Sequence, residues 1–552
     1  MLDALNIPLT ILFFLFCFWT IALIFIYGRA SSPARPLRSA GLRWLLRGVF
    51  MLFLGFYLYQ ATWQLAGFAR PDFMDFMRKY SRRQVNPAKE MARGSICDRN
   101  GVVLAFSENL QRRYPYGRNF CHLLGYADPM FGLAGLEAAD NAFLDGLTVA
   151  SKDELGRFGM NILNRREAEG NRLCLTIDGR LQAAAAALLR ERPGAAVALR
   201  TSDGSVLALA SAPSFDPEKL DPSIFSPAGS VPSPLLNRAL QGAYPPGSVI
   251  KIMVAACALE SGFDGLIDCP PEGYTPPGRY HLPIRDHEYY EHQRRKTEWS
   301  GLGRIGLEKG FARSSNVFFA QLGVRLGSRR LNETAARFLF NSRLELFQGS
   351  SGIIAARQSA WPVLEPEDRG GMAQQSIGQG ALLVTPLHMA LVAAAVACGG
   401  QPYAPRLAER TQPRLLEPMM TPAASEKLKL LMRHAVEHGT GRGANIKDLN
   451  IAGKTGTAQV PDGADHAWFV CFAPADRPAI AVAAIVEHGG YGAASALPVA
   501  VGLIKQAKAL GLMEPPPEPP AAHESGSRQN GTKAERALQA PLASSPTKEP
   551  KP

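Results

Sequence analysis

The chain has 552 residues, of which 46% are hydrophobic and 20% are charged, and its formal net charge is +12. This length and composition are typical of two or three globular domains and exclude a disordered or fibrous protein. The positive charge alone suggests a nucleic-acid partner, but no basic run is interleaved with aromatic residues and no segment resembles a recognition helix. We therefore expect no nucleic-acid partner, and a solvated basic surface or attraction to an anionic membrane instead.

Two segments of 21 residues, 7–27 and 48–68, carry no charged side chain. Each is long enough to cross about 30 Å of hydrocarbon as a helix, so we expect a helical hairpin in the membrane. A signal peptide is the alternative for the first segment, but residues 1–6 lack a basic side chain and no convincing cleavage site follows. The loop between the segments holds five arginines and no acid, which predicts that it faces the cytoplasm, although basic residues after the second segment weaken this signal.

Beyond the hairpin, residues 71–190 mix short apolar runs with turn residues and predict a small mixed domain, with a hairpin turn at Asn100-Gly101. From Gly194 the pattern changes to long apolar runs joined by a TSDG turn, which predicts a β-hairpin buried on both faces. Near the other end three strand candidates and a helix follow, at 451–460, 467–475, 479–489 and 493–510. Two early and three late strands would close one antiparallel sheet, with the helical middle packed on it.

After residue 513 the chain is rich in Ser, Pro, Lys and Glu, and it should be disordered. The expected organisation therefore has four parts: two membrane helices with an Arg-rich loop, a small domain, a larger sheet domain and a tail, at residues 1–70, 71–190, 191–513 and 514–552.

The cysteines are spread along the chain, at Cys17, Cys97, Cys121, Cys174, Cys257, Cys269, Cys398 and Cys471. None falls in a C-x-x-C pair or another metal-ligand spacing, so no metal site is predicted. We expect most of them to be core residues. If the domains are exported, a disulfide is possible, but the sequence does not assign its partners.

The segment YPPGSVIKI places Ser248 and Lys251 three residues apart, where a helix is expected to begin. Side chains at i and i+3 lie on one helix face, so the lysine amine can reach the serine hydroxyl. A serine becomes a nucleophile when a base takes its proton, and a lysine can be that base if burial or a second cation lowers its pKa. The pattern alone is weak, because Ser545 and Lys548 match it by chance in the tail.

A second polar element, Ser314-Ser315-Asn316, stands between two apolar helical stretches. Its hydroxyl and amide groups can pass a proton and hold a peptide carbonyl. Taken alone, however, the element is better interpreted as a helix cap, because Ser and Asn favour those positions.

The third element is Lys454-Thr455-Gly456-Thr457, in a predicted strand. Side chains two apart share a face, so Lys454 points where Gly456 leaves room for a ligand backbone to approach. A phosphate loop is the competing interpretation, but Asp448 occupies the position of its first glycine, so nucleotide binding is not expected.

Two other patterns do not have the residue spacing that a zinc site or a nucleophilic serine turn requires. His287 and His292 are five residues apart and so do not share the helix face that a zinc pair requires. The GSSG segment at 349–352 is too short for the strand-to-helix turn that carries a nucleophilic serine in hydrolases.

The three elements occur in the order S-x-x-K, S-x-N and K-T-G, the set that penicillin-binding proteins and class A β-lactamases share. Further segments carry the likeness: RGSICDRNGVVLA, LTIDGRLQ, VLALASAPSFDP, SIGQG and AWFVCFAP. Over about residues 93–500 the chain resembles the class B penicillin-binding proteins, which are peptidoglycan D,D-transpeptidases. The expected fold is α+β. The transmembrane hairpin comes from the two uncharged segments, and the resemblance implies a pedestal domain and a β-lactamase-like transpeptidase domain with a five-stranded antiparallel sheet.

The resemblance also implies catalytic roles. Ser248 would attack the penultimate D-alanine carbonyl of a donor stem peptide, with Lys251 as the base. Ser314 would relay a proton to the leaving D-alanine, Asn316 would bind the substrate amide, and Lys454 would supply positive charge.

The K-T-G strand would bind the substrate, again by resemblance. Thr455 and Thr457 would hold the terminal carboxylate beside Gly456, while the backbone N–H groups of Ser248 and Thr457 would form the oxyanion hole. No cofactor is implied. The implied partners are peptidoglycan stem peptides, β-lactam antibiotics, the membrane and a separate multispanning glycan polymerase, with the catalytic domain outside the cytoplasmic membrane.

Three other functions compete with cross-linking. A β-lactamase or D,D-carboxypeptidase would use water as the acceptor, but a secreted hydrolase does not need a membrane hairpin and a separate small domain. A β-lactam sensor would need a signalling domain, and the segments on the cytoplasmic side are too short for one. A silent scaffold is disfavoured by the intact set of motifs. The sequence does not distinguish a role in division from one in elongation.

Overall fold

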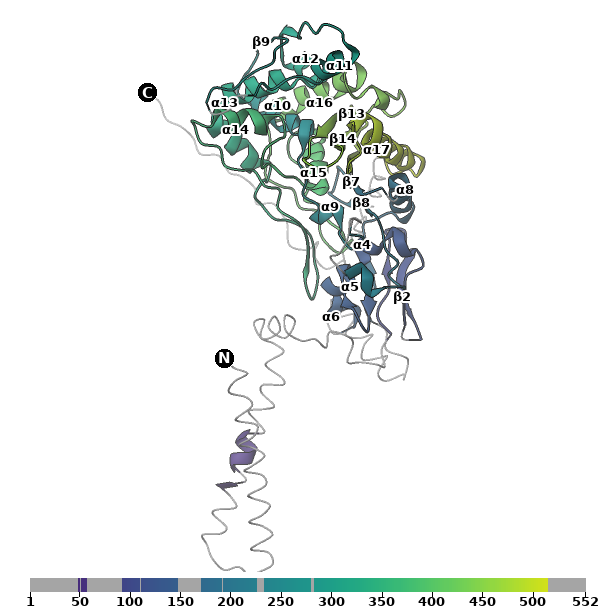
Figure 1. Cartoon of the computed structure of the whole chain (residues 1–552). Helices are drawn as coiled ribbons and strands as arrows, with labels where there is room; N and C mark the ends of the chain where they lie inside the picture. The colour runs from purple at the N-terminus through teal and green to yellow at the C-terminus, as the bar shows by residue number, and fades with distance from the viewer. Residues whose placement is uncertain are drawn as a thin grey trace, which may run out of the picture. The chain divides into compact units, whose positions relative to one another are not determined.

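The computed structural model describes residues 48–49, 51–56, 92–109, 111–146, 170–190, 192–225, 233–278 and 282–514 (Figure 1). The chain divides into two compact units, Met1–Pro87 and Ala88–Pro552. Most of the predicted membrane hairpin lies outside the described residues, as does the predicted disordered tail from 515 onward. Among the residues that are described, no helix has the length and apolar character needed to span a membrane.

The second unit is built on the five-stranded antiparallel sheet that the sequence predicts. Its order is β13 (Ala452–Ala458), β14 (His466–Ala473), β15 (Ile480–Val486), β7 (Gly194–Arg200) and β8 (Val206–Ala212). Every residue of β8, β14 and β15 is buried. Burial on both faces explains why these strands read as continuous apolar runs rather than as an alternating pattern.

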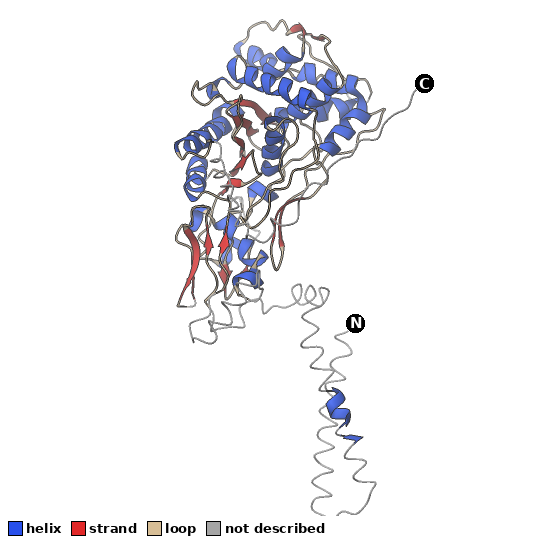
Figure 2. Cartoon of the chain, turned by 180° about the vertical axis from the view of Figure 1, so that it is seen from behind, coloured by secondary structure: helices blue, strands red, loops and turns tan. Residues whose placement is uncertain are grey.

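Helices cover both faces of this sheet (Figure 2). Alternate residues of β7 point to opposite sides, as strand geometry requires. Ala196 and Ala198 share one apolar core with α8 (Gly179–Leu189) and α17 (Gly492–Ala509). Val197 belongs to the other core, with α15 (Pro386–Ala397). Helix α8 thus packs with the large sheet, although its sequence precedes the expected boundary at residue 191.

A group of helices lies beside β13, at the edge of the sheet (Figure 1). Its members are α10 (Lys251–Glu260), α12 (Leu307–Ala312), α13 (Asn316–Arg337), α14 (Arg369–Ser376) and α16 (Pro422–Glu437). Helix α10 packs on α13 and α16, and α12 packs on α16. Because α10 and α13 each begin at one of the predicted motifs, this packing brings the motifs toward the K-T-G strand.

The part of the second unit before α8, described at residues 92–109, 111–146 and 170–174, is called the small lobe here. It contains a second sheet in the order β3 (Gln111–Arg113), β2 (Val103–Glu108), β1 (Ile96–Cys97) and β6 (Leu173–Cys174). The predicted Asn100-Gly101 turn joins β1 to β2, and the φ of +80° at Gly101 is one that glycine adopts without strain. Short helices accompany this sheet: α4 (Cys121–Leu124), α5 (Gly135–Ala139) and α6 (Asn141–Leu144).

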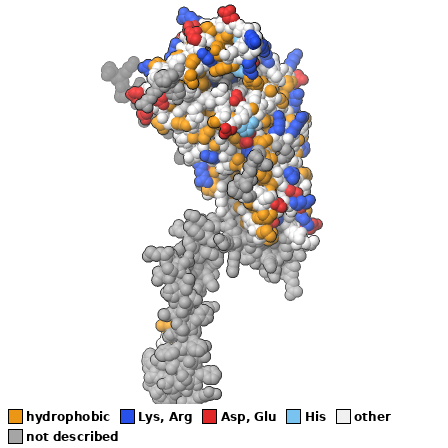
Figure 3. Space-filling model, viewed as in Figure 1, with side chains coloured by type: hydrophobic (Ala, Val, Ile, Leu, Met, Phe, Trp, Pro, Cys, Tyr) orange, Lys and Arg blue, Asp and Glu red, His pale blue; other side chains and the backbone are white. Residues whose placement is uncertain are grey.

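The remaining elements are short. They are η1 (Gly117–Asn119), β4 (Ala127–Asp128), β5 (Gly132–Leu133), η2 (Pro222–Phe225), α9 (Arg238–Gln241), η3 (Gly247–Ile250), β9 (Ile267–Cys269), α11 (His287–Arg295), β10 (Gly303–Ile305), β11 (Leu344–Gln348), β12 (Ile353–Ala356) and η4 (Arg442–Ala444). On the face drawn in Figure 3, acidic and basic side chains are interspersed, as expected of a solvated surface.

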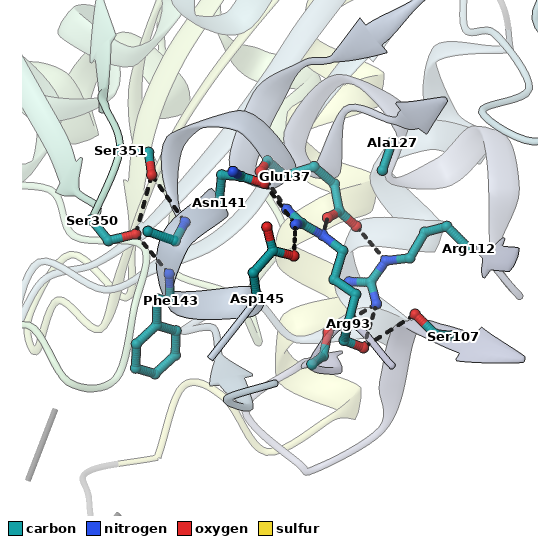
Figure 4. Close-up of polar contacts among 12 residues, drawn as sticks. Arg93, Ser107, Arg112, Ala127, Glu137, Asn141, Phe143, Asp145, Ser350 and Ser351 are labelled. Atoms are coloured by element: carbon teal, nitrogen blue, oxygen red, sulfur yellow. Dashed lines mark hydrogen bonds and ion pairs between the residues drawn. The ribbon is translucent and has the colours of Figure 1, made fainter. Parts of the chain in front are cut away.

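A buried ionic cluster organises the small lobe (Figure 4). The wholly buried carboxylate of Glu137 accepts hydrogen bonds from Arg93 Nε at 2.6 Å and Arg112 Nε at 2.7 Å. Arg93 also pairs with Asp145 at 2.6 Å. Burial would raise the pKa of Glu137, but the two guanidinium groups outweigh it and hold the pKa below its usual value. The cluster therefore ties α5 and α6 to the chain that enters β1.

The β11–β12 hairpin reaches from the large domain to the small lobe (Figure 4). At its tip, Phe143 N donates to Ser350 Oγ at 2.9 Å and Ala142 N donates to Ser351 Oγ at 3.0 Å. The first backbone N–H groups of a helix have no acceptor within the helix. The two serine hydroxyls therefore satisfy N–H groups at the start of α6. The GSSG segment is thus a contact between the two lobes.

We predict that Glu137→Ala lowers the free energy of unfolding by about 3–5 kcal/mol, because it leaves the buried guanidinium of Arg112 without a counter-charge and leaves Arg93 with Asp145 alone. Thermal unfolding of the purified protein measures the loss. Glu108→Ala is the matched control: its carboxylate is 57% exposed in its pair with Arg113, so we expect a change within about 0.5 kcal/mol. Equal stability of the two variants would contradict the structural role of the cluster.

Candidate active site

Ser248 lies on η3, a tight turn that leads directly into α10. The preceding Gly247 has a φ of +52°, and a Cβ there would lie 2.4 Å from the carbonyl oxygen of Thr457. Only glycine fits this close approach of two backbones. The half-buried Ser248 lines a cavity of about 500 Å³, a volume typical of a small-molecule site.

Two neighbouring segments hold the turn in place. Gly247 N donates to the carbonyl of Gly378 at 3.0 Å, and the buried Trp468 donates through Nε1 to the carbonyl of Pro245 at 3.0 Å. A Cβ on Gly378 would lie 2.0 Å from Gly247 O, so this position also requires glycine. The SIGQG segment and β14 therefore determine where the serine stands.

The ammonium of Lys251 is buried and contacts the second motif. Nζ donates to Ser314 O at 2.6 Å, to Asn316 Oδ1 at 2.8 Å and to Ser314 Oγ at 3.4 Å. Burial lowers the pKa of Lys251 to about 7, against the opposing effects of Asp286 and Glu288. Much of this amine is therefore neutral near physiological pH and able to accept a proton.

The Ser314-Ser315-Asn316 segment connects α12 to α13. Ser315 is the N-cap of α13, where its Oγ accepts from Phe318 N at 3.0 Å, so the helix-cap interpretation holds for this residue. Ser314, at a φ of +57°, and Asn316 turn toward Lys251 and line the cavity instead. The motif serves as a cap and as a cavity wall at once.

Lys454 is the second buried lysine, and it contacts the same hydroxyl as Lys251. Its Nζ donates to Ser314 Oγ at 2.7 Å and to Thr455 O at 3.1 Å. Burial and the nearby Lys251 hold the pKa of Lys454 well below its usual value. Ser314 therefore links the S-x-x-K and K-T-G motifs, and the structure brings all three motifs together.

The rest of the K-T-G strand forms one wall of the cavity, to which Thr455, Gly456 and Thr457 all contribute. Thr455 Oγ1 lies 2.5 Å from Thr440 Oγ1, in the turn that follows α16. A Cβ on Gly456 would meet Val249 Cγ1 at 2.8 Å. Glycine at position 456 thus leaves room for the turn that carries Ser248. Motif spacing alone did not reveal this reason for the glycine.

Sequence reasoning missed Asp286. Its buried carboxylate accepts from Ser315 Oγ at 2.9 Å and from Val317 N at 3.0 Å, which fixes the turn between α12 and α13. Burial raises the pKa of this carboxyl. Asp286 stands in a polar stretch without apolar periodicity, so no sequence signal separated it from a solvated surface residue.

A second missed feature is the wall formed by α11, the helix that contains His287 and His292. His287, Tyr290 and Arg294 line the cavity, together with Tyr491 from the start of α17. Arg294 donates to Tyr491 Oη at 2.9 Å, and the ring of His287 packs edge-on against that of Tyr491. His292 bonds Thr297 instead. His287, Tyr290, Arg294 and Tyr491 are all exposed and form an open wall of the cavity.

One group in the described chain can present metal ligands: His434 and Glu437 on α16 and His438 just after it hold their donor atoms within 4.8 Å of one another. All three are at least partly exposed, and Glu437 already pairs with Arg433 at 3.0 Å. The expectation of no metal site rested on the cysteine spacing and stays a prediction.

Comparison with known families gives two matches. Residues 194–505 match the model of the penicillin-binding protein transpeptidase domain, and residues 93–173 match that of the penicillin-binding protein A dimerisation domain. The transpeptidase match alone covers more than half of the chain.

Relatives with curated names point to the same family as these two matches. The chain is 30% identical to the peptidoglycan D,D-transpeptidase MrdA of Acinetobacter baumannii, over 70% of this chain and 64% of that protein, so it spans less than two thirds of that relative. It is 31% identical to the peptidoglycan D,D-transpeptidase PbpA of Mycolicibacterium smegmatis, over 71% of this chain and 83% of the relative.

Among solved structures, the ceftriaxone acyl-enzyme of penicillin-binding protein A from Mycobacterium tuberculosis superposes with a TM-score of 0.67 at 28% identity, covering 76% of this chain and 99% of that one. Penicillin-binding protein 2 of Pseudomonas aeruginosa gives a TM-score of 0.61 at 31% identity, covering 76% and 95%. With the three motifs around one cavity, these likenesses confirm the resemblance. The chain belongs to the class B penicillin-binding proteins.

Proposed function

We propose that the protein is a peptidoglycan D,D-transpeptidase that cross-links stem peptides through an acyl-enzyme on Ser248. The observation that carries the proposal is the position of Ser314 Oγ, in contact with the buried amines of Lys251 and Lys454, in the cavity that Ser248 lines. This arrangement supplies a nucleophile, a base of suitable pKa and a proton relay within one site.

In the first step Ser248 Oγ attacks the penultimate D-alanine carbonyl, and its proton passes to neutral Lys251. The proton then travels through Ser314 to the nitrogen of the leaving D-alanine. Asn316 is placed beside this path to hold the substrate amide. Within the described chain, Lys251 Nζ makes its hydrogen bonds to Ser314 and Asn316, and the bond to Ser248 would form in the substrate complex, where catalytic hydrogen bonds commonly tighten.

The K-T-G strand positions the substrate. Thr455 and Thr457 offer hydroxyls to its terminal carboxylate. Burial lowers the pKa of Lys454, and the arrival of this anion favours the protonated form of the amine, which then adds a positive charge at the same end. The backbone N–H groups of Ser248 and Thr457 are the donors for the oxyanion that forms on attack. Gly247 is responsible for their spacing, because it lets the serine turn pack directly on the strand. In the second step an amine of another stem peptide takes the acyl group.

A transpeptidase transfers the acyl group to an amine of a second peptide, whereas a hydrolase transfers it to water. The wall of α11 and Tyr491 extends the site with His287, Tyr290 and Arg294, beyond what a terminal D-alanyl-D-alanine would fill. Such a surface suits a second peptide strand. A β-lactam, which mimics D-alanyl-D-alanine, would acylate Ser248 and inhibit the protein.

We further infer that a membrane hairpin in residues 1–70 anchors the chain in the bacterial cytoplasmic membrane. In this proposal residues 71–190 form a pedestal, residues 191–513 form the extracytoplasmic catalytic domain, and residues 514–552 are a disordered tail. The motifs recognised in this region resemble those of a pedestal rather than those of a glycan polymerase, so a separate multispanning polymerase would make the strands that this protein cross-links. The uncharged segments 7–27 and 48–68 support the anchor.

We predict that Ser248→Ala abolishes covalent labelling by a fluorescent penicillin while thermal stability stays close to that of the parent, because the variant loses only one half-buried hydroxyl. Gel fluorescence and peptide mapping of the labelled site measure the effect. Ser261→Ala, on a distant turn after α10, serves as the control and should label normally. Full labelling of the Ser248 variant would rule out the assigned nucleophile.

The pH dependence of acylation tests the role of Lys251. Only the neutral amine accepts a proton, so the rate of penicillin acylation should rise with pH through a midpoint near the Lys251 pKa of about 7 and fall about tenfold per unit below it. Lys251→Ala should slow acylation about 10² to 10⁴ fold and remove this step from the profile. The exposed Lys505→Ala is the control. A flat profile in the parent would reject the assignment.

Topology is tested with single cysteines. A cysteine placed at Ser39 should be protected from a membrane-impermeant thiol reagent in cells whose outer barrier has been opened, whereas one at Ser81 should react. The expectation follows from the arginine-rich loop between the uncharged segments. The reverse pattern would overturn both the topology and the export of the catalytic domain.

A further inference from the structure

Two cysteines from distant parts of the sequence meet in the small lobe. Strands β1 and β6 pair in parallel, and the register sets Cys97 directly opposite Cys174. Their Sγ atoms lie 2.8 Å apart, although the residues are separated by 77 positions. Cys97 is buried and Cys174 is half-buried.

The backbone geometry at this pair suits a covalent bridge. Neighbouring strands lie about 4.8 Å apart, within the range of roughly 4.4–6.8 Å that disulfides span between Cα atoms. The sulfur atoms need to approach by less than about 1 Å to reach the bonded distance of about 2.0 Å. The two side chains leave the same face of the sheet, so no backbone rearrangement is required.

The other described cysteines stand in separate places in the fold. They lie on α4, α10, β9, at the end of α15 and on β14, as Cys121, Cys257, Cys269, Cys398 and Cys471. Cys398, for example, donates to the carbonyl of Thr201 at 3.3 Å. These positions agree with the expectation that most cysteines are core residues, and they set the pair in β1 and β6 apart.

We propose that Cys97 and Cys174 form a disulfide in the mature protein. The inference rests on the proposed extracytoplasmic location of the domain, because disulfides persist in oxidising compartments. Two S–H bonds break and one S–S bond forms. The two electrons and two protons pass to the oxidised disulfide of a thiol–disulfide oxidoreductase, which becomes a dithiol.

The surroundings of the pair affect the reactivity of the Cys174 thiol and the position of the Cys97 sulfur. Burial and the hydrogen bond to Cys97 raise the pKa of the Cys174 thiol to about 12, so this thiol stays protonated at neutral pH. The thiolate is the species that attacks a disulfide, so attack by Cys174 itself is slow. The nearby Arg172 donates through Nε to Cys97 Sγ at 3.2 Å and holds that sulfur beside its partner.

The bridge would stabilise the small lobe beside its connection to the large sheet. The residues that follow each cysteine already bind one another: Asn100 Nδ2 donates to Asp178 Oδ2 at 3.0 Å, and Gly179 N donates to Asp98 Oδ2 at 3.0 Å. Asp178 is also the N-cap of α8, which packs on the large sheet. A covalent link here closes a loop that contains α4, α5 and α6, and so restricts the unfolded small lobe.

Peptide mapping of the full-length protein tests the bridge. The protein is purified from membranes in detergent, with free thiols alkylated at lysis, and digested with trypsin without reductant. Cleavage after arginine releases Cys97 in residues 94–99 and Cys174 in residues 173–180. We expect these two peptides to be recovered mainly as one cross-linked species that disappears on reduction.

Variants supply the controls. Cys97→Ser and Cys174→Ser should each leave one new alkylatable thiol, whereas Cys257→Ser, in the core of α10, should leave the cross-linked peptide in place. Reductant should lower the melting temperature of the parent by several degrees and leave that of the double serine variant unchanged.

Penicillin labelling separates this inference from the proposed function. If the membrane-purified protein labels at Ser248 while both peptides are recovered singly alkylated, the disulfide is rejected and the function stands. If the cross-linked peptide is present and no penicillin labelling occurs, the disulfide stands and the proposed function is rejected.

Discussion

The burial of two lysines around one serine hydroxyl is the constraint on which the site depends. Lys251 and Lys454 both contact Ser314 Oγ, and both amines are removed from water. Two charged ammonium groups that contact the same hydroxyl in a low-dielectric interior repel each other strongly, so the site favours a neutral amine. The fold maintains this arrangement by packing α10, the start of α13 and strand β13 around the pair, and the resulting low pKa values make base catalysis possible at neutral pH.

Close backbone packing gives the site its second requirement, a fixed position for the nucleophile. Gly247, Gly378 and Gly456 each stand where a Cβ would collide with the serine turn or its neighbours. Without these side chains, the turn, the SIGQG segment and the K-T-G strand form one rigid layer. An oxyanion hole made of backbone N–H groups requires such a layer, because small displacements weaken hydrogen bonds to the developing charge. The glycines therefore contribute to catalysis through position rather than through contact with substrate.

The small lobe shows how the same physical rules connect domains. The Arg93–Glu137–Arg112 cluster and the serines at the tip of the β11–β12 hairpin satisfy buried charges and helix-end N–H groups from different parts of the chain. The ion pairs offset the burial cost of these charges within the small lobe, whereas the two serines satisfy N–H groups across the lobe boundary. The connection from β1 and β6 into α8 adds a third contact of this kind, and the paired cysteines lie within it.

Local patterns were sufficient to predict the five strands, their antiparallel sheet and the three motifs, since strand burial and turn chemistry leave their mark on neighbouring residues. Periodicity could not find Asp286 or the wall of α11, because these polar residues owe their role to distant partners such as Ser315 and Tyr491. Likewise, spacing placed Ser248 and Lys251 on one helix face, but tertiary packing directed the amine to Ser314 and Asn316. The pairing of Cys97 with Cys174 also required the fold. A strand register is set by long-range burial, which no short stretch of sequence contains.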